Sequence, residues 1–250
     1  MNFRNKVTSA IQSAISTKFN SSTEGSTGSG THELAVSKHF EECGFLLIEK
    51  SVSKSTVSFY KRGPNKDKEK PQGKVLVMDK VTHSPTKDIE IPYEDGCYQI
   101  VQPYQLTTRG SFNPAPDMYL VCVENKAIVD WIGIECKSSK TMRPTWNDNL
   151  PRPFKEGNIL YLFTGTYQKE TYNCIFTNEI FFQGKDYQKI TTLYENARKF
   201  LEEEWKRMNC HEEFPDLSAS FRIKCEQKNN FTPEMIKDYN EKTLMFLRNM

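Results

Sequence analysis

The sequence predicts a layered α/β domain, in which a mixed central β-sheet is flanked by α-helices. Apolar residues recur at helical spacing near both ends of the chain, while short strand-like runs fill the region between them. In addition, the run 127–136 is apolar on both faces up to Ile134, as expected for a central strand that is covered by helices.

The composition is that of a single folded domain spanning residues 1–250. Hydrophobic residues make up 37% and aromatic residues 12% of the 250 residues, enough for a sizeable core. The net charge of +2 argues against a protein that binds polyanions by bulk charge, but it allows a local basic cleft. Seven cysteines without a CxxC pair are typical of reduced intracellular thiols. No apolar run reaches about 18 residues, so we expect a cytoplasmic protein with no membrane partner.

Two helices are predicted before the strands. Residues 2–19 carry an apolar stripe formed by Phe3, Val7, Ile11, Ile15 and Phe19. The Ser/Gly/Thr-rich segment 20–31 is predicted to be a flexible loop. Thr31 would then cap a second helix, which ends at Gly44 and turns Leu34, Phe40 and Cys43 toward the core.

Runs rich in β-branched and aromatic residues predict the strands. The first set lies at 45–50, 55–62, 74–81, 89–93 and 97–104, with a charged, solvated turn at 63–73. Residues 118–123 and 127–136 are predicted to pair as a hairpin. Two more strands are predicted at 158–167 and 172–182.

The segment 187–250 is predicted to contribute the C-terminal helices. Residues 187–208 form the clearest helix, with an apolar stripe of Ile190, Leu193, Tyr194, Ala197, Phe200, Leu201, Trp205 and Met208. We assign this stripe mainly to the domain core, and a dimer interface is the alternative. Thr232-Pro233-Glu234 begins a further helix at 232–248.

Two carboxylates and a lysine are placed at adjacent strand ends. Asp117 follows Pro116 at the start of one apolar run, and Glu135-Cys136-Lys137 ends the next. Glu135 and Lys137 share one strand face, whereas Ile134 and Cys136 point into the core. Because carboxylates bind Mg²⁺ and an ammonium offsets developing negative charge, the pattern predicts metal-assisted phosphodiester cleavage. The alternative is an ordinary surface hairpin with acidic ends.

A second copy of the spacing occurs at Pro215-Asp216 and Glu226-Gln227-Lys228. There, Gln227 would have to occupy the core position that Cys136 fills, so we discard it.

The first set resembles the PD-(D/E)XK nuclease superfamily, and within it the type II restriction endonucleases. Gln102-Pro103, Gly110-Ser111 and Pro116-Asp117 resemble the approach to the first catalytic acid in a group of these enzymes. The run from Glu135 to Pro151, with its ECKSSK and WN segments, resembles their continuation. The helix that carries Glu33 resembles their first core helix. The resemblance covers about residues 31–165 and implies a restriction-endonuclease-like catalytic core there.

The resemblance also implies roles for the site residues. Asp117 and Glu135 would be metal ligands, with Cys136 in the same metal set, and Lys137 would be the water-orienting base or an electrostatic stabiliser. Glu33 would be a further catalytic acid that supports the metal site. It competes with Glu41, and a first-turn glutamate favoured by the helix dipole is an equal interpretation.

The implied function is a Mg²⁺-dependent type II restriction endonuclease that hydrolyses double-stranded DNA and leaves 5′-phosphate ends. A palindromic DNA site would call for a homodimer, and a separate cognate methyltransferase would protect host DNA. The alternatives are a DNA repair or recombination nuclease of the same fold, and a non-catalytic DNA-binding protein.

Several residues near this set are candidates for DNA contacts. Ser138, Ser139 and Lys140 could hold phosphates, and Arg143 and Asn147 could read base edges beyond them. Trp146 in the same loop is a further candidate for a DNA contact. Arg109 approaches from the other side of the predicted cleft. The ordinary alternatives are a solvated arginine and a Trp146 that packs its loop onto the sheet.

Overall fold

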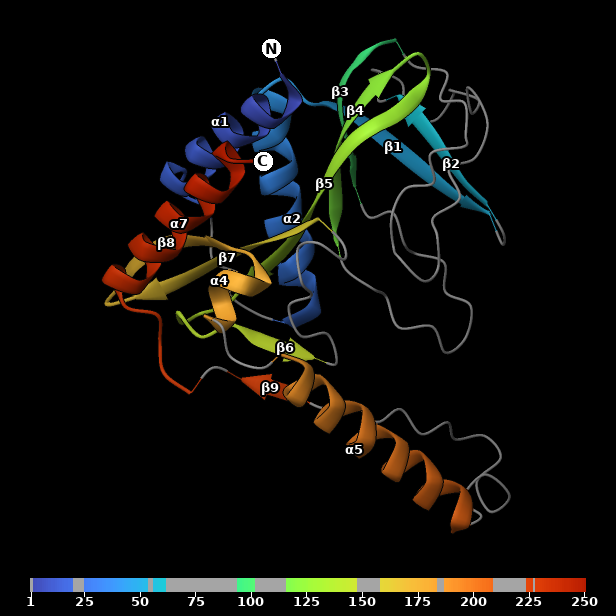
Figure 1. Cartoon of the computed structure of the whole chain (residues 1–250), viewed down its shortest axis with the longest axis vertical. Coiled ribbons are helices and arrows are strands. Elements are labelled where there is room, and N and C mark those ends of the chain that lie inside the picture. Colours follow the sequence, from blue (N-terminus) through green and yellow to red (C-terminus); the bar gives the residue numbers. More distant parts are fainter. Residues whose placement is uncertain are drawn as a thin grey trace.

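A mixed β-sheet lies at the centre of the protein, seen here in a computed structural model (Figure 1). The structure describes residues 2–19, 25–53, 56–61, 94–101, 116–147, 158–183, 187–208, 224–226 and 228–250. Within them the seven-stranded sheet runs in the order β2 (Thr56–Lys61), β1 (Leu46–Ser53), β3 (Gly96–Val101), β4 (Met118–Glu124), β5 (Ala127–Ser138), β7 (Ile159–Tyr167) and β8 (Glu170–Phe176). The predicted strands 74–81 and 89–93 and the charged turn 63–73 lie outside the described residues.

The strand directions make the sheet mixed, as predicted. β1 pairs in parallel with β3 and β5 with β7, while the other neighbours pair antiparallel. The predicted hairpin is formed by β4 and β5, and its turn residues Asn125 and Lys126 have positive φ angles of 50° and 62°. Such angles match the tight turns that suit the twist of antiparallel strands.

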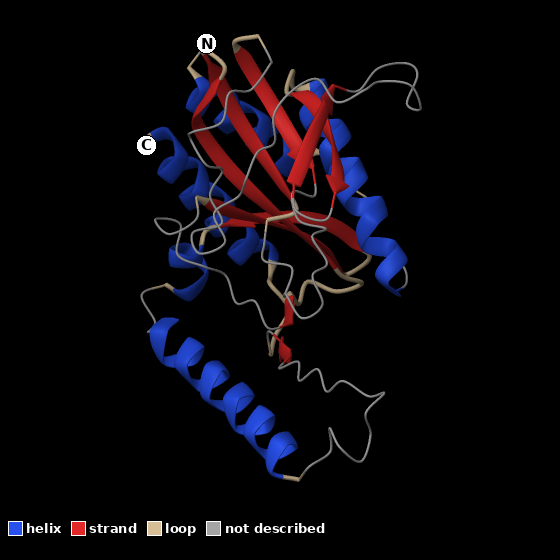
Figure 2. Ribbon diagram, turned by 90° about the vertical axis from the view of Figure 1, so that its right-hand side faces the viewer, coloured by secondary structure: helices blue, strands red, loops and turns tan. Residues whose placement is uncertain are grey.

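Three helices cover one side of the sheet: α1 (Phe3–Ser16), α2 (Gly25–Glu42) and α7 (Pro233–Arg248) (Figures 1 and 2). Asn2 caps α1, whose buried stripe contains Phe3, Val7 and Ile11 as predicted. These residues meet the inward side chains of the sheet and Leu244 and Leu247 of α7 in the larger core cluster. The predicted α/β class with a helix-flanked mixed sheet is therefore confirmed.

α2 differs from the prediction at its start and at Leu34, whereas Phe40 is buried and Cys43 packs against the core as predicted. It begins at Gly25, so the expected flexible loop at 20–31 overlaps its first turns, because a helix that is already packed can extend into weak helix formers. Leu34, predicted to be core, is 64% exposed. The helix instead buries Ser37, whose hydroxyl donates to Gln99 Oε1 at 3.1 Å while Gln99 Nε2 donates back to the Ser37 carbonyl at 2.8 Å.

The last predicted strand is shorter than expected. β8 ends at Phe176, and α4 (Asn178–Phe182) follows because the Thr177 side chain caps it by accepting the Ile180 N–H. The edge of β8 is covered by α7. Asn240 accepts the Ile175 N–H at 2.7 Å and donates to the Asn173 carbonyl at 3.0 Å, and Thr243 donates to the Ile175 carbonyl at 2.9 Å.

α5 (Tyr187–Arg207) extends away from the sheet (Figures 1 and 2). Its Ile190 and Tyr194 pack against a second cluster around Trp146, Tyr161 and Phe176. The stripe is exposed at Leu193, between these two residues, and further along at Phe200, Leu201 and Met208, so its assignment to the domain core is wrong for these four residues.

A short two-stranded sheet of β6 (Thr145–Asn147) and β9 (Lys224–Glu226) completes the described elements. Among all the described residues, no helix combines the length and the hydrophobicity that a membrane span requires.

Candidate active site

The β4–β5 hairpin brings Asp117 next to Glu135. Met118 is paired with Ile134, so the residue before Met118 lies beside the residue after Ile134. Asp117 Oδ2 accepts the main-chain N–H of Cys136 at 2.7 Å, and Lys137 Nζ forms an ion pair with Glu135 Oε1. The three residues that the sequence placed at adjacent strand ends therefore lie together.

Gly133 allows this approach. A Cβ atom at position 133 would lie only 2.7 Å from Pro116 Cγ and 3.2 Å from Pro116 Cβ, so the proline ring rests where any side chain would stand. Pro116 fixes the backbone just before Asp117 and thereby its carboxylate. The sequence signal for this contact was an isolated glycine inside a strand pattern, which often marks a close approach of another chain segment.

The electrostatics of the site are dominated by crowded negative charge. Burial raises the pKa of the Asp117 carboxyl well above its usual value, and the nearby charges of Glu135 and Glu33 raise it further. Glu33 lies on α2, so its charge reaches the hairpin from a different element. This favours Glu33 over Glu41, which lies about 12 Å further along the helix.

Lys137 is held as a cation. Burial alone would lower the pKa of its ammonium, but attraction to Glu135 and Asp117 outweighs this effect and leaves the pKa raised. A lysine with a raised pKa keeps its proton at neutral pH. Of the two roles expected for Lys137, the arrangement favours electrostatic stabilisation over proton abstraction.

The residues present fit a hard divalent cation. Glu135 is 5% exposed, and its second oxygen, Oε2, is buried without a hydrogen-bond partner. Such an oxygen beside a second buried carboxylate has no compensating donor, and a cation would supply one. No cluster of three or more His, Cys, Asp and Glu side chains with metal-binding geometry occurs among the described residues. Mg²⁺ needs only one or two carboxylates, because waters and substrate oxygens complete its shell.

Cys136 does not supply a thiol ligand in this arrangement. Its side chain is buried in the larger core cluster, as the strand alternation predicted. Burial also raises the pKa of the thiol well above its usual value, whereas a metal ligand would have to be the thiolate. Cys136 is therefore removed from the expected metal set, which leaves Asp117 and Glu135 as its side-chain ligands.

The loop after β5 is fixed from behind. The Ser139 N–H donates to the Thr164 carbonyl at 3.0 Å, and the Met142 carbonyl accepts the Phe231 N–H at 2.7 Å. Gly165 lets the loop lie against β7, since a Cβ there would stand 2.7 Å from Met142 Sδ and closer still to the Thr141 carbonyl. The sequence motif gave no sign of the contact at Gly165 either.

The same loop presents its polar side chains outward. Lys140 and Arg143 are exposed and Ser139 is half-buried, whereas half-buried Ser138 is still on β5 and falls on the strand face of Ile134 and Cys136. Three of the DNA-contact candidates, Ser139, Lys140 and Arg143, are therefore at least partly exposed after β5. Arg109 and the side chain of Asn147 lie outside the described residues.

Trp146 occupies a different environment. It is 1% exposed, and its ring packs edge-on against Tyr161 and Phe181 with centroids 5.4 and 5.7 Å apart. The structure therefore favours the packing interpretation of Trp146 over a contact with DNA. Pro215-Asp216 of the discarded second motif lies outside the described residues.

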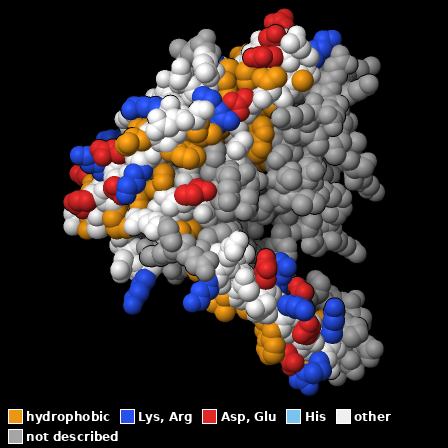
Figure 3. Space-filling model, in the orientation of Figure 1, with side chains coloured by type: hydrophobic (Ala, Val, Ile, Leu, Met, Phe, Trp, Pro, Cys, Tyr) orange, Lys and Arg blue, Asp and Glu red, His pale blue; other side chains and the backbone are white. Residues whose placement is uncertain are grey.

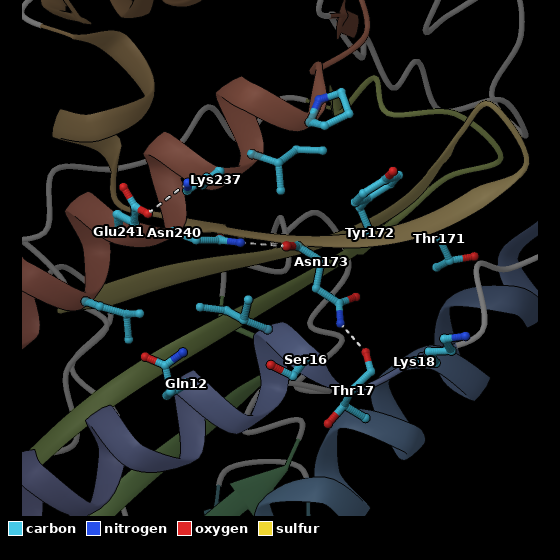
Figure 4. A pocket seen from close by; sticks show the side chains of 14 residues that line it. Gln12, Ser16, Thr17, Lys18, Thr171, Tyr172, Asn173, Lys237, Asn240 and Glu241 are labelled. Atoms are coloured by element: carbon cyan, nitrogen blue, oxygen red, sulfur yellow. Dashed lines mark hydrogen bonds and ion pairs between the residues drawn. The ribbon is translucent and has the colours of Figure 1, made fainter.

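A groove of about 440 Å³ lies elsewhere, between the end of α1, β8 and α7 (Figure 4). Figure 4 shows Asn173 reaching toward Thr17 of α1 and Asn240 of α7 reaching toward the Asn173 main chain. Asn173 also donates to the Ala14 carbonyl at 2.8 Å. These amides hold the three elements together, which gives the groove floor a structural role.

Comparisons of the chain with protein-family models, with curated proteins and with solved structures found no match. The site therefore rests on its own geometry: the buried Glu135, the half-buried Asp117 and Lys137 on one hairpin, the charge of Glu33 from α2, and a fixed loop after β5.

Proposed function

We propose that this protein is a Mg²⁺-dependent endodeoxyribonuclease of the type II restriction kind, with the restriction-endonuclease-like core that the sequence motif implies. The observation that supports this most directly is the meeting of Asp117, Glu135 and Lys137, with one Glu135 oxygen buried and without a donor. A hairpin with merely acidic ends would leave its carboxylates in water, where their charge costs little.

Each residue has a distinct task in this proposal. Asp117 and Glu135 would hold Mg²⁺, which lowers the pKa of a bound water and stabilises charge on the phosphorus. The Lys137 ammonium orients the attacking water and offsets negative charge on the phosphate. Glu33 on α2 would contribute its negative charge near Asp117 without being one of the two ligands. Lys140 and Arg143 bind flanking phosphates and position the DNA strand.

The products would be 5′-phosphate and 3′-hydroxyl ends, one cut in each strand of a short DNA site. Cleavage of both strands calls for a homodimer with one site per strand, and host DNA would be protected by a separate methyltransferase. A repair or recombination nuclease would use the same acids on branched or mismatched DNA. A non-catalytic DNA-binding protein would have no use for a buried carboxylate cluster.

Purified protein incubated with plasmid and phage DNA tests the proposal. Discrete bands that appear with Mg²⁺ and disappear with EDTA would support restriction, and cutting confined to branched or mismatched DNA would point to repair. DNA binding without any cleavage would exclude both nucleases. End-sequencing of the products would then give the recognition sequence and the cut position.

Two variants test the site itself. Asp117→Ala and Lys137→Ala should each reduce the cleavage rate by roughly 100-fold or more, since each removes a charge used in the transition state. Lys137→Ala should leave DNA binding largely intact. Lys126→Ala is a matched control, because Lys126 is an exposed lysine at the opposite end of the same hairpin. Full activity in either site variant would remove the assignment.

A further inference from the structure

Two cysteines face each other across neighbouring strands of the central sheet. In the antiparallel pairing of β3 with β4, Cys97 is the direct partner of Cys122, and both thiols are free. Directly opposed residues of such a pair point to the same face of the sheet, with Cα atoms about 4.5–5.5 Å apart. A disulfide needs a Cα separation of about 4.4–6.8 Å. The backbone of this pair therefore already has the spacing of a disulfide.

Both cysteines are accessible from solvent, although they lie on the helix-covered side of the sheet. They are half-buried and pack against the larger core cluster, whereas Cys136 and Cys174 are buried. On its other side Cys122 is paired with Asp130 of β5, which forms a partly exposed ion pair with Arg4 of α1. The cysteine pair therefore lies where the helix layer is thin, and a small reagent can reach it.

The surroundings of the pair are acidic. Glu94 and Asp95 before β3 and Glu124 at the end of β4 are exposed, and Lys126 offsets one of these three charges. Figure 3 shows acidic side chains gathered at the top of the molecule, where β4 turns into β5 in Figure 1. An anionic oxidant such as glutathione disulfide is repelled by this surface, whereas neutral hydrogen peroxide is not. The oxidant that fits the site is therefore a small neutral peroxide.

We propose that Cys97 and Cys122 form a reversible disulfide when the protein meets hydrogen peroxide. The Cys97 thiolate attacks one peroxide oxygen, the O–O bond breaks, and the other oxygen leaves as water with the proton that the thiol lost. Cys97 is then a sulfenic acid. The Cys122 sulfur attacks the Cys97 sulfur, the S–O bond breaks as the S–S bond forms, and a second water leaves. Two thiols and one peroxide thus give one disulfide and two waters.

The order of the two steps follows from the environment of Cys122. Burial is the main reason that the pKa of its thiol is raised to about 11, and the neighbouring Cys97 sulfur is the next. A thiol with this pKa keeps its proton at neutral pH, so Cys122 is not the first to attack. In the second step it needs no diffusional encounter, because the Cys97 sulfenic acid is held beside it at a high effective concentration.

Peptide mapping by mass spectrometry tests the bond. Trypsin separates the two cysteines because it cuts after Arg109, so the disulfide would join peptides 88–109 and 110–126. Wild-type protein treated with hydrogen peroxide should give these linked peptides, and dithiothreitol should remove the link. In concentrated urea the same treatment should scatter the pairing among the seven cysteines. Oxidised Cys97 without linked peptides, or an equal yield from the unfolded chain, would overturn the proposal.

Variants separate the pair from the other thiols. Cys43→Ser is the matched control, because Cys43 is also half-buried but lies on α2 beside His39, and it should leave the linked peptides unchanged. Cys122→Ser should stop the reaction at a Cys97 sulfenic acid that dimedone traps, whereas Cys97→Ser should leave Cys122 as a thiol. Trapping on Cys122 alone, or loss of the link in Cys43→Ser, would contradict the assignment.

The bond should also change the stability of the protein. It closes a loop from residue 97 to residue 122 and so restricts the unfolded chain. We expect the unfolding equilibrium constant to fall roughly 100-fold on oxidation, measured by urea denaturation. Hydrogen peroxide should form the bond faster than glutathione disulfide at equal concentration. An unchanged stability, or faster oxidation by glutathione disulfide, would count against the proposal whatever the cleavage assays show, because none of these measurements involves DNA.

Discussion

At the scale of single residues, Asp117 is held in a position that its charge disfavours. Its carboxylate is buried beside Glu135 and within the field of Glu33, and these effects together raise its pKa. A site that binds a cation strongly is expected to be unstable without one, because the ligands repel each other until the cation arrives.

Asp117→Asn should therefore stabilise the metal-free protein while it abolishes cleavage. The amide oxygen can still accept the Cys136 N–H, but the buried negative charge is gone. We expect the free energy of unfolding in EDTA at pH 8 to rise by about 1 kcal/mol or more, measured by urea denaturation. Asp130→Asn on the same hairpin is the control and should lower the free energy of unfolding, because Asp130 forms an ion pair with Arg4. A loss of stability in both variants would contradict the account.

Gly133 should be required for the position of Asp117. Gly133→Ala places a methyl group against the Pro116 ring, so the ring and the following carboxylate must shift. We expect a loss of Mn²⁺ affinity of roughly 10-fold or more and a similar loss of cleavage. Pro116→Gly in the same chain removes the clash and should restore part of both. Unchanged Mn²⁺ binding by Gly133→Ala, measured by calorimetry, would show that the contact does not position the acid.

His32 should give the protein a sensitivity to acid. It is 3% exposed, neither ring nitrogen has a hydrogen-bond partner, and burial lowers its pKa to about 4. Between the ordinary value of 6.5 and this value, the unfolded chain binds a proton that the folded protein does not. Stability should fall by up to about 3 kcal/mol as pH drops through this window. His32→Phe should remove this fall in the free energy of unfolding, measured by urea denaturation at pH 7.5 and 4.5. If the wild type and the variant lose the same stability between these two pH values, His32 is not the cause.

At the scale of elements, α7 stabilises the sheet through polar contacts as well as packing. Asn240→Ala would leave the Ile175 N–H and the Asn173 carbonyl without partners at a buried strand edge. We expect a loss of about 2–4 kcal/mol in the free energy of unfolding, measured by urea denaturation. Asp238→Ala on the same helix, whose ion pair with Lys242 is exposed, should cost much less. Equal losses would mean that the edge contacts contribute little.

The elements that the sequence predicted well are those with local signals. The α1 stripe, the β4–β5 hairpin and the Thr232 cap all follow from spacing or from a capping residue. The burial of Ser37 on α2 could not be predicted, because it depends on Gln99 of β3, a partner distant in sequence. The exposure of α5 was missed, because an apolar stripe has the same periodicity whether or not the domain core covers it.

In the candidate site, too, the features with a local sequence signal were predicted and those that depend on distant segments were not. Strand alternation placed Glu135, Cys136 and Lys137 on their correct faces, because that pattern is a property of one strand. The close contacts at Gly133 and Gly165 were missed, since each depends on a segment that crosses the strand from elsewhere in the chain. Trp146 was ambiguous for the same reason, and its aromatic neighbours decide its burial.

At the scale of the whole molecule, the proposed function predicts how DNA is cut. A homodimer with one site per strand could cut both strands of a duplex in one binding event. The first product from supercoiled plasmid should then be linear DNA, measured on gels at early times. Nicked plasmid as the first product would contradict a homodimer with one site per strand.

The cover that α7 gives to β8 also bears on how the protein behaves when concentrated. Residues 172–176, YNCIF, carry no charge and no proline, and consist mainly of residues that favour strands. Left open, such an edge recruits further chains and grows into insoluble aggregates. Asn240 and Thr243 occupy the groups that would begin this process. Loosening of α7, well before the sheet itself melts, should therefore be the step that limits the shelf life of the protein in solution.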